Sequence, residues 1–168
     1  FEGMALYMAG NFTVTGFDEP ERVQGEYVAH GYFELLGMSP QLGRTFDDGE
    51  DSVPQRDAVV VLSDGLWRRR FGADPDVLGR KIQLSEKAYT VIGVMPAWFR
   101  GVDDNADLWA PLMMALTPED LKDRNSRGPA VLARLKAGVG LTQAQSEMDA
   151  ICKGLEEQYR KSNEARGV

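Results

Sequence analysis

The sequence predicts one domain in which β-hairpins are combined with a few helices. Three observations support this prediction. Short β-rich runs separated by Gly, Pro and Asp fill the first part of the chain, helical patterns there are brief, and one long apolar stripe with helical spacing follows them. With 168 residues, 43% of them hydrophobic and 27% charged, the chain can bury one compact core, in one lobe or two.

The first predicted elements are a hairpin and a short helix. Extended stretches span 6–15 and 22–28, and residues 16–20 between them contain Gly, Asp and Pro, which favour turns. A helix of about two turns is predicted over 30–37, because apolar residues recur there at helical spacing. Gly37 suits the left-handed conformation that often follows a helix end.

A strand followed directly by a helix is predicted next. Residues 58–62 are apolar and mostly β-branched without polar alternation, which is typical of a central strand covered on both faces. Ser63 supplies a hydroxyl for the helix N-cap, and Asp64 places negative charge in the first turn. Gly72 ends this helix.

The second half of the chain begins with another hairpin. Its strands are predicted at 81–84 and 89–95, with a turn at 85–87. A short strand closed by proline follows at 107–111. The last strand, predicted at 128–136, alternates apolar and basic residues, so one of its sides should face water.

The final element has the strongest helical pattern. Thr142 and Gln145 have the spacing of a capping box, which places the helix start at Thr142. Gly154 lies inside the helix at a cost of ~1 kcal/mol relative to alanine, which packing of the apolar stripe on a sheet should offset. That stripe consists of Leu141, Ala144, Met148, Ile151, Leu155 and Tyr159.

The charge balance argues against binding to nucleic acids. Lys and Arg total 19 against 26 Asp and Glu, and the resulting net charge of −7 repels phosphate backbones. No glycine-rich phosphate loop is present in the sequence. We interpret the arginines at 68–70 as a solvated helix face rather than an anion site.

Several classes of site and segment are excluded by what the sequence lacks. His30 is the only histidine and Cys152 the only cysteine, so neither an internal disulfide nor a zinc site of the usual type can form. No apolar run approaches the ~20 residues of a membrane helix, and no basic and apolar leader begins at Phe1. We therefore expect a soluble chain without a targeting segment, and no metal or cofactor.

Two acidic stretches, 47–51 and 103–107, invite comparison with calcium-binding loops. Hard cations prefer clustered oxygen ligands, but an EF-hand beginning with the second stretch would need Gly and Glu where Leu108 and Met114 stand. We favour solvated acidic loops, with an aspartate of the first stretch capping a turn.

Candidate nucleophiles and bases have simpler interpretations. Ser63 opens a helix after a buried strand, but the flanking Leu62 and Asp64 lack the Gly-x-Ser-x-Gly pattern, which favours a helix cap. His30 precedes a helix and no motif supplies a partner for it, so we expect a surface or cap histidine.

The aromatic residues suggest one surface for partner contact. Trp67 and Trp109 lie inside predicted elements and should pack in the core. Trp98, Phe99 and Arg100 follow the second hairpin, and their aromatic and basic character makes them the candidate partner-contact residues.

An ordered set of sequence blocks carries a family resemblance. The blocks read YVAHGYFELLGMSP (27–40), GRTF (43–46), VVVLS (59–63), WRRRFGADP (67–75), GRKIQL (79–84) and VIGVMP (91–96). Together they strongly resemble the MacB-like periplasmic core domain of FtsX-type ABC transporter permeases. The resemblance is close over 23–111 and looser over the last strand and helix.

This resemblance implies an α+β fold of two lobes, with mixed and antiparallel sheets and a few helices. Residues 22–127 would form an inserted lobe, while 1–21 and 128–168 would contribute to a lobe akin to the porter module of efflux pumps. We expect that second lobe to be incomplete in this chain. The domain would lie on the periplasmic side of the bacterial inner membrane, between membrane helices outside this sequence.

The resemblance also implies a function without catalysis. Such permeases work as dimers and convert cytoplasmic ATP hydrolysis into movement beyond the membrane, in efflux or in lipoprotein or peptide export. The implied partners are a permease dimer partner, an ATP-binding subunit or domain, and a periplasmic adaptor protein. The family supplies no catalytic residues for this domain, and it often has serine where His30 stands.

Two alternatives remain at this point. A stand-alone extracellular ligand-binding or adhesion module would use the tryptophans and acidic loops as its surface, and membrane segments on both sides of this chain would exclude it. A hydrolase would use Ser63 or an acidic pair, and a pocket joining Ser63 or Asp47 to a group with a strongly shifted pKa would support it.

Overall fold

One mixed sheet organises residues 1–123 and 128–159, the part of the chain that the computed structural model describes. Its content is α+β, in agreement with the predicted fold class. The strands are β1 (Gly3–Thr15), β2 (Glu21–Val28), β3 (Leu42–Gly43), β4 (Val59–Leu62), β5 (Lys81–Leu84), β6 (Lys87–Val94), β7 (Leu108–Pro111) and β8 (Ala130–Arg134). The helices are α1 (Tyr32–Leu36), α2 (Asp64–Phe71) and α3 (Leu141–Gln158), with 3-10 turns η1 (Pro75–Val77) and η2 (Leu112–Met114).

Six of these strands form a closed ring of paired strands. Their order is β2-β7-β4-β6-β5-β1, and β1 also pairs with β2, so the path returns to its start. We call β1, β2, β4, β5, β6 and β7 the strand ring. The β2–β7 and β4–β6 pairs are parallel and the other pairs of the ring are antiparallel. Both predicted hairpins, β1–β2 and β5–β6, are confirmed.

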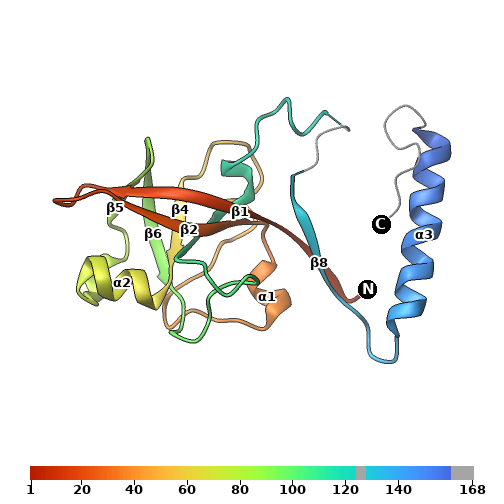
Figure 1. The fold of residues 1–168 in the computed structure, drawn as a ribbon, viewed down its shortest axis with the longest axis horizontal. Coiled ribbons are helices and arrows are strands. Elements are labelled where there is room, and N and C mark those ends of the chain that lie inside the picture. Colours follow the sequence, from red (N-terminus) through yellow and green to blue (C-terminus); the bar gives the residue numbers. More distant parts are fainter. Residues whose placement is uncertain (124–127, 160–168) are drawn as a thin grey trace.

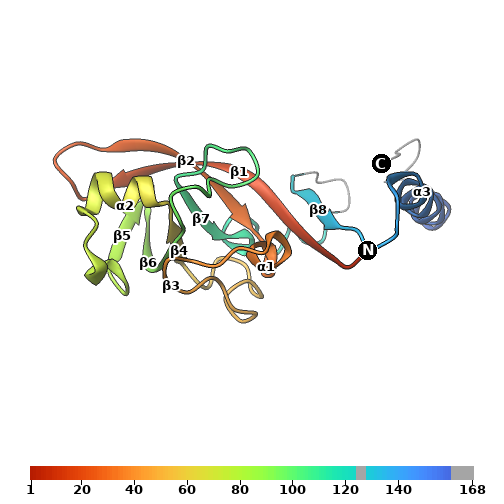
Figure 2. The same cartoon turned by 90° about the horizontal axis from the view of Figure 1, so that it is seen from below.

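β1 extends beyond the ring into a second part of the molecule. Its residues 7–14 pair with β2 and residues 14–15 with β5, whereas residues 3–7 pair with β8. We call residues 3–7 of β1 together with β8 and α3 the arm. Figures 1 and 2 show the arm on one side of the strand ring, with α3 lying apart from the ring in both views.

Two apolar clusters pack on opposite faces of β4. Val60 and Leu62 belong to one cluster and Val61 to the other, and all three are fully buried. This confirms the prediction of a central strand covered on both faces. Trp109 is fully buried, as predicted, whereas Trp67 is half-buried at the edge of the first cluster.

The local signals around the two short helices are also confirmed. Ser63 Oγ accepts a hydrogen bond from the main-chain N–H of Leu66 at 3.1 Å and so caps α2. Gly72 follows α2 with φ of 62°, and Gly37 follows α1 with φ of 70°. Glycine adopts these left-handed conformations without a steric penalty, so both helices end where the sequence indicates.

The arm departs from the sequence-based expectations. α3 begins at Leu141 after Gly140, so Thr142 lies inside the first turn and the predicted capping box is wrong. The expected packing of the apolar stripe on a sheet is also wrong, because α3 lies beside one end of β8 and only Ala144 is buried. Leu141 remains 81% exposed.

β8 is exposed on both sides rather than on one. Val131, expected to face inward, is 59% exposed, and Leu132 is the only half-buried residue of the strand. The reason is that β8 pairs with β1 at the outer end of the described sheet, where α3 does not cover it. None of the helices in the described ranges is both long and apolar enough to cross a bilayer.

Candidate partner-contact site

The connection between β6 and β7 carries the predicted contact residues. Trp98 is 73% exposed, and Arg100 is also exposed. The Arg100 guanidinium has no ion pair with any residue of the ranges 1–123 and 128–159. An exposed indole two positions from an exposed cation is suited to recognition rather than to core packing.

Phe99 does not share this exposure. Its side chain is 8% exposed, and its ring stacks on Trp109 with 5.2 Å between centroids and 29° between planes. Phe33 lies on another side, with 6.1 Å between ring centroids. The expectation that Phe99 is a surface residue is therefore wrong, because neighbouring aromatic rings offer it a buried site that the sequence alone does not reveal.

A buried carboxylate holds the β6–β7 connection by a hydrogen bond. Glu26, on β2, is 2% exposed. Its Oε2 accepts hydrogen bonds from the Tyr32 hydroxyl at 2.6 Å and from the Trp109 indole N–H at 2.8 Å, and its Oε1 accepts one from the main-chain N–H of Val102 at 3.0 Å. Burial of this charge is tolerated because donors from three segments converge on it.

The Tyr32 hydroxyl is held in its donor form. Burial raises the pKa of Tyr32 far above the usual tyrosine value, and the hydrogen bond to Glu26 and the charge of that carboxylate raise it further. Sequence analysis missed this cluster, because Glu26 is flanked in sequence by residues of mixed polarity. Its partners Trp109 and Val102 are also far away along the chain.

A polar hollow of about 330 Å³ opens beside the connection, between it and the start of α2. Its charged groups are largely paired: Asp64 binds Arg68 at 2.7 Å, and Asp107 binds Arg69 at 3.3 Å. Ser63 is 4% exposed and its hydroxyl oxygen is engaged in the α2 cap. The hollow is lined by Ser63, Asp64, Gly65, Arg69, Ala97, Phe99, Arg100 and Asp107.

Two of the three consecutive arginines, Arg69 and Arg70, hold α2 against the end of the first hairpin. Arg69 Nε lies 2.8 Å from Glu21 Oε1, and Arg70 donates both to Glu21 and, at 3.2 Å, to the carbonyl oxygen of Glu19. The interpretation of a solvated face is therefore wrong for Arg70, which is 21% exposed. It holds for Arg68, which is 62% exposed.

These ion pairs lower the pKa of two carboxyl groups. For Glu21, burial alone would raise the pKa, but the hydrogen bonds and charges of the two arginines outweigh it. For Asp64, the hydrogen bond from Arg68 lowers the pKa, burial opposes this effect, and a hydrogen bond from Gln41 adds to it. Both groups therefore stay ionised at neutral pH, Glu21 as a partner of α2 and Asp64 within the first turn of that helix.

The first acidic stretch forms a capped turn. Asp47 Oδ1 accepts hydrogen bonds from the main-chain N–H groups of Gly49 at 3.0 Å and Glu50 at 3.1 Å, which confirms the predicted aspartate cap. Arg44 binds both carboxylate oxygens of Glu50 at 2.7 Å. Within the described ranges, no group of three or more His, Cys, Asp or Glu residues is placed to hold a metal ion.

His30 lies at the surface and is tied to this stretch. Its Nε2 lies 2.5 Å from Asp48 Oδ1, and its main-chain N–H donates to Asp51 Oδ2 at 2.9 Å. The other oxygen of Asp51 accepts from the main-chain N–H of Met113 at 3.0 Å. The acidic residues thus join the start of α1 to η2.

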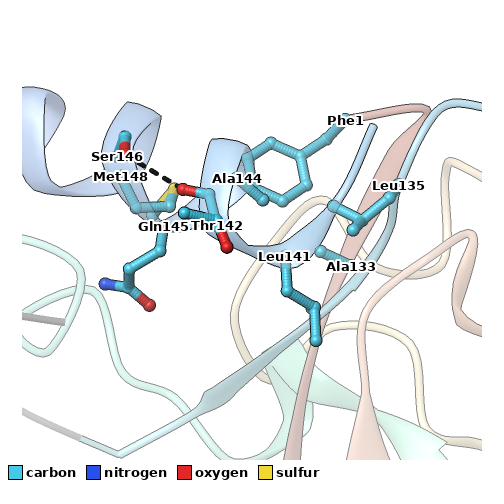
Figure 3. Close-up of a pocket in the computed structure, with 9 residues that line it drawn as sticks. All are labelled: Phe1, Ala133, Leu135, Leu141, Thr142, Ala144, Gln145, Ser146 and Met148. Atoms are coloured by element: carbon cyan, nitrogen blue, oxygen red, sulfur yellow. Dashed lines mark hydrogen bonds between the residues drawn. The ribbon is translucent and has the colours of Figure 1, made fainter. Parts of the chain in front are cut away.

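A mostly apolar hollow lies at the end of the arm. It measures about 640 Å³, and Figure 3 shows Phe1 and Leu135 on one side of it and Ala144 and Met148 of α3 on the other. A dashed line in the same view marks the hydrogen bond of 2.9 Å from the Ser146 hydroxyl to the Thr142 carbonyl oxygen. This hollow lies at the far end of the arm and does not include the predicted contact residues.

Comparison with known proteins identifies the family. The model of the MacB-like periplasmic core domain matches residues 1–151. The chain belongs to this family. The resemblance recognised in the sequence is thereby confirmed.

MacB proteins are among its relatives. The macrolide export ATP-binding/permease protein MacB of Neisseria gonorrhoeae (strain ATCC 700825 / FA 1090) is 35% identical over 86 residues, which are 50% of this chain and 13% of that protein. Its counterpart from Burkholderia thailandensis is 32% identical over 90 residues, covering 52% of this chain and 14% of the relative. The chain thus spans a small part of these MacB proteins.

Solved structures share the fold of this MacB-like domain. The periplasmic region of MacB from Actinobacillus actinomycetemcomitans has a TM-score of 0.68 at 16% identity, covering 96% of this chain and 69% of that one. The extracellular domain of the noncanonic ABC-type transporter YknZ from Gram-positive bacteria has a TM-score of 0.69 at 16% identity, covering 96% and 79%. At these identities the comparison establishes the architecture alone.

Proposed function

We propose that this domain is the extracytoplasmic part of an ABC transporter permease and that it transmits movement. In this role it passes the motion driven by cytoplasmic ATP hydrolysis to a partner or cargo on the far side of the inner membrane. It performs no bond chemistry itself. The observation that supports this proposal best is the continuity of β1, which runs through both the arm and the strand ring.

A continuous strand is a suitable mechanical connection. Because β1 is hydrogen-bonded to β8 in the arm and to β2 and β5 in the ring, a displacement of the arm acts on the ring without an intervening flexible loop. Packed elements shift as rigid units, so the arm and the ring can shift relative to each other while β1, which bends between them (Figure 1), keeps the two coupled. We assign residues 22–127 to the inserted lobe and 1–21 with 128–168 to the porter-like lobe, with β1 shared between them.

We further propose Trp98 and Arg100 as the contacts to a protein partner. Exposed Trp and Arg residues carry much of the binding energy at protein interfaces. The partner surface that fits them has an apolar pocket for the indole and a carboxylate for Arg100. The second permease protomer and a periplasmic adaptor are the candidates, while Phe99 supports the connection from inside.

The names of the relatives suggest what kind of transport the complete permease carries out. Two of them are named macrolide export proteins, which makes efflux the first candidate activity for the complete permease. Lipoprotein or peptide export is the second candidate. The ATP-binding subunit or domain would act on this chain through membrane helices.

A distance measurement in the complete permease tests the transmission of movement. Spin labels at Ile151 on α3 and Lys81 on β5, with Cys152 replaced by serine, report the distance between arm and ring. We expect this distance to differ between the nucleotide-free and ATP-bound states. Labels at Arg22 and Lys81, both in the ring, are the matched control and should give one distance in both states. An unchanged distance for the first pair contradicts the proposal.

A further inference from the structure

We infer that Glu26 is a positioning residue for the partner-contact surface. Its buried carboxylate holds the β6–β7 connection so that Trp98 and Arg100 are presented in one arrangement before a partner binds. This inference rests on the proposed role of these two residues as contacts. It adds a residue from a different strand, with no exposed surface of its own, to the same site.

The carboxylate joins three separate segments. Tyr32 belongs to α1, Trp109 to β7 and Val102 to the connection itself, and each donates one hydrogen bond to Glu26. The first two donors hold the carboxylate in place from the folded core. The third bond then fixes the backbone of the connection to that anchored group.

Gly101 brings the connection unusually close to the carboxylate. Its φ is +82°, and a Cβ atom at this position would lie 2.4 Å from Glu26 Oε1 and 2.6 Å from its Cδ. No side chain fits there, so the backbone itself packs on the carboxylate. A contact of this kind leaves the connection little freedom to shift above Glu26.

Further bonds fix the chain on both sides of Trp98 and Arg100. The main-chain N–H of Phe99 donates to the Pro96 carbonyl at 3.0 Å, and that of Ala106 donates to the Arg100 carbonyl at 2.8 Å. With the backbone fixed, only side-chain freedom is lost when Trp98 and Arg100 meet a partner. Preorganisation of this kind favours binding because less entropy is lost on association.

The hydrogen-bond pattern requires a carboxylate rather than an amide. Glutamine at position 26 would offer one acceptor oxygen and one NH₂ group. Two donors face the Oε2 position, and one of them, the Trp109 indole N–H, cannot accept a hydrogen bond. The amide nitrogen is therefore expected at the Oε1 position, facing the Val102 N–H. Glu26→Gln should release the connection while the two core bonds remain.

Hydrogen exchange of the full chain, measured by NMR, tests this role. In Glu26→Gln, we expect the Val102 amide to exchange about tenfold faster or more, because its acceptor is lost. We also expect lower heteronuclear NOE values for the amides of residues 97–104, with the amides of β4 and β6 unchanged. Tyr32→Phe is the comparison variant: it removes the hydroxyl, which the Val102 N–H also approaches, but it keeps the Glu26 Oε1 acceptor, so the Val102 amide should stay better protected than in Glu26→Gln.

Two results would overturn the inference. One is Val102 exchange in Glu26→Gln at the wild-type rate. The other is equal loosening of residues 97–104 in Tyr32→Phe, which would mean that any loss from the cluster destabilises this region and that Glu26 has no specific role.

A separate assay tests the contacts themselves. Cells that produce the complete permease with Trp98→Ala should lose macrolide resistance, and Glu26→Gln should lower it by releasing the connection. If Trp98→Ala leaves resistance intact, the proposed contact is contradicted, whereas the exchange data alone decide whether Glu26 holds the connection. The two failures are therefore distinguishable.

Discussion

The guanidinium of Arg134, on β8, donates hydrogen bonds to the main-chain carbonyl oxygen of Leu35 in α1, with 3.0 Å from Nε to the oxygen. The N–H groups of Gly37 and Met38 donate to other carbonyl oxygens near the end of α1. Arg134 therefore donates to a carbonyl oxygen that has no hydrogen-bond donor within the helix. Gly3 of β1 faces the Leu35 side chain at the same place. This contact fastens the arm to α1, the helix that follows β2 of the ring.

Removal of this contact should loosen the arm without unfolding the ring. Arg134→Ala loses hydrogen bonds at an exposed site, so we expect the free energy of unfolding to fall by about 1 kcal/mol or less. Spin labels at Ile151 and Lys81 should report a broader distance distribution. Lys136→Ala, which removes a nearby exposed cation, is the control, and an equally broad distribution in it would count against the contact.

Gly101 and Gly138 provide a matched test of steric fit. Both have φ of +82°, but a Cβ at Gly101 would overlap Glu26, whereas nothing lies within 4 Å of one at Gly138. Gly138→Ala should cost about 1 kcal/mol of backbone strain. Gly101→Ala should cost about 2 kcal/mol more in urea unfolding, because the connection must move off the carboxylate. Equal losses would mean that the close approach is not rigid.

Two neighbouring aromatic residues should differ sharply in their effect on stability. Phe99→Ala empties a buried site against Trp109 and should lower the free energy of unfolding by about 3–5 kcal/mol. Trp98→Ala removes an exposed side chain and should change it by no more than about 0.5 kcal/mol. Urea denaturation of both variants checks this, and a large loss for Trp98→Ala would place its indole in the core.

Acid should weaken the attachment of α2 through Asp64. The pKa of Asp64 in the folded protein lies below its ordinary value of 3.8, so its ionised form stabilises the fold above that pH. This stabilisation is lost as the pH falls below 3.8 toward the lower pKa of the folded state. Asp64→Asn should therefore be less stable than the wild type at neutral pH.

The difference between the two proteins should shrink as the pH falls through this range. Arg68→Met, which removes the main cause of the lowered pKa, should reduce the pH dependence in part, because Gln41 still donates to Asp64 at 2.8 Å. Unfolding free energies measured along a pH series check both expectations. Parallel curves for the wild type and Asp64→Asn would contradict them.

Local signals in the sequence predicted the segment from β4 to the end of α2. A β-branched run, a cap at Ser63 and a stop at Gly72 each act within a few residues, so their meaning does not depend on distant parts of the chain. The same is true of both hairpins and of the end of α1 at Gly37.

Long-range relationships could not be predicted in this way. Closure of the ring depends on the pairing of β2 with β7, in which Glu26 meets Trp109 although 83 positions separate them along the chain. The burial of Phe99 and the role of Glu26 both depend on that pairing. For α3, the apolar stripe indicates a buried face but cannot say which surface covers it, and Ala144 is the only one of its six residues that is buried, while Leu141 and Ile151 are exposed.

The unbroken course of β1 also limits how the gene can change. Side chains alternate between the two faces of a strand, so insertion of one residue between Tyr7 and Gly10 would turn every outward residue of the arm inward relative to the ring. An insertion of two residues would restore the facing but move the arm outward by about 6.6 Å. Viable length variants of this stretch should therefore differ from one another by even numbers of codons.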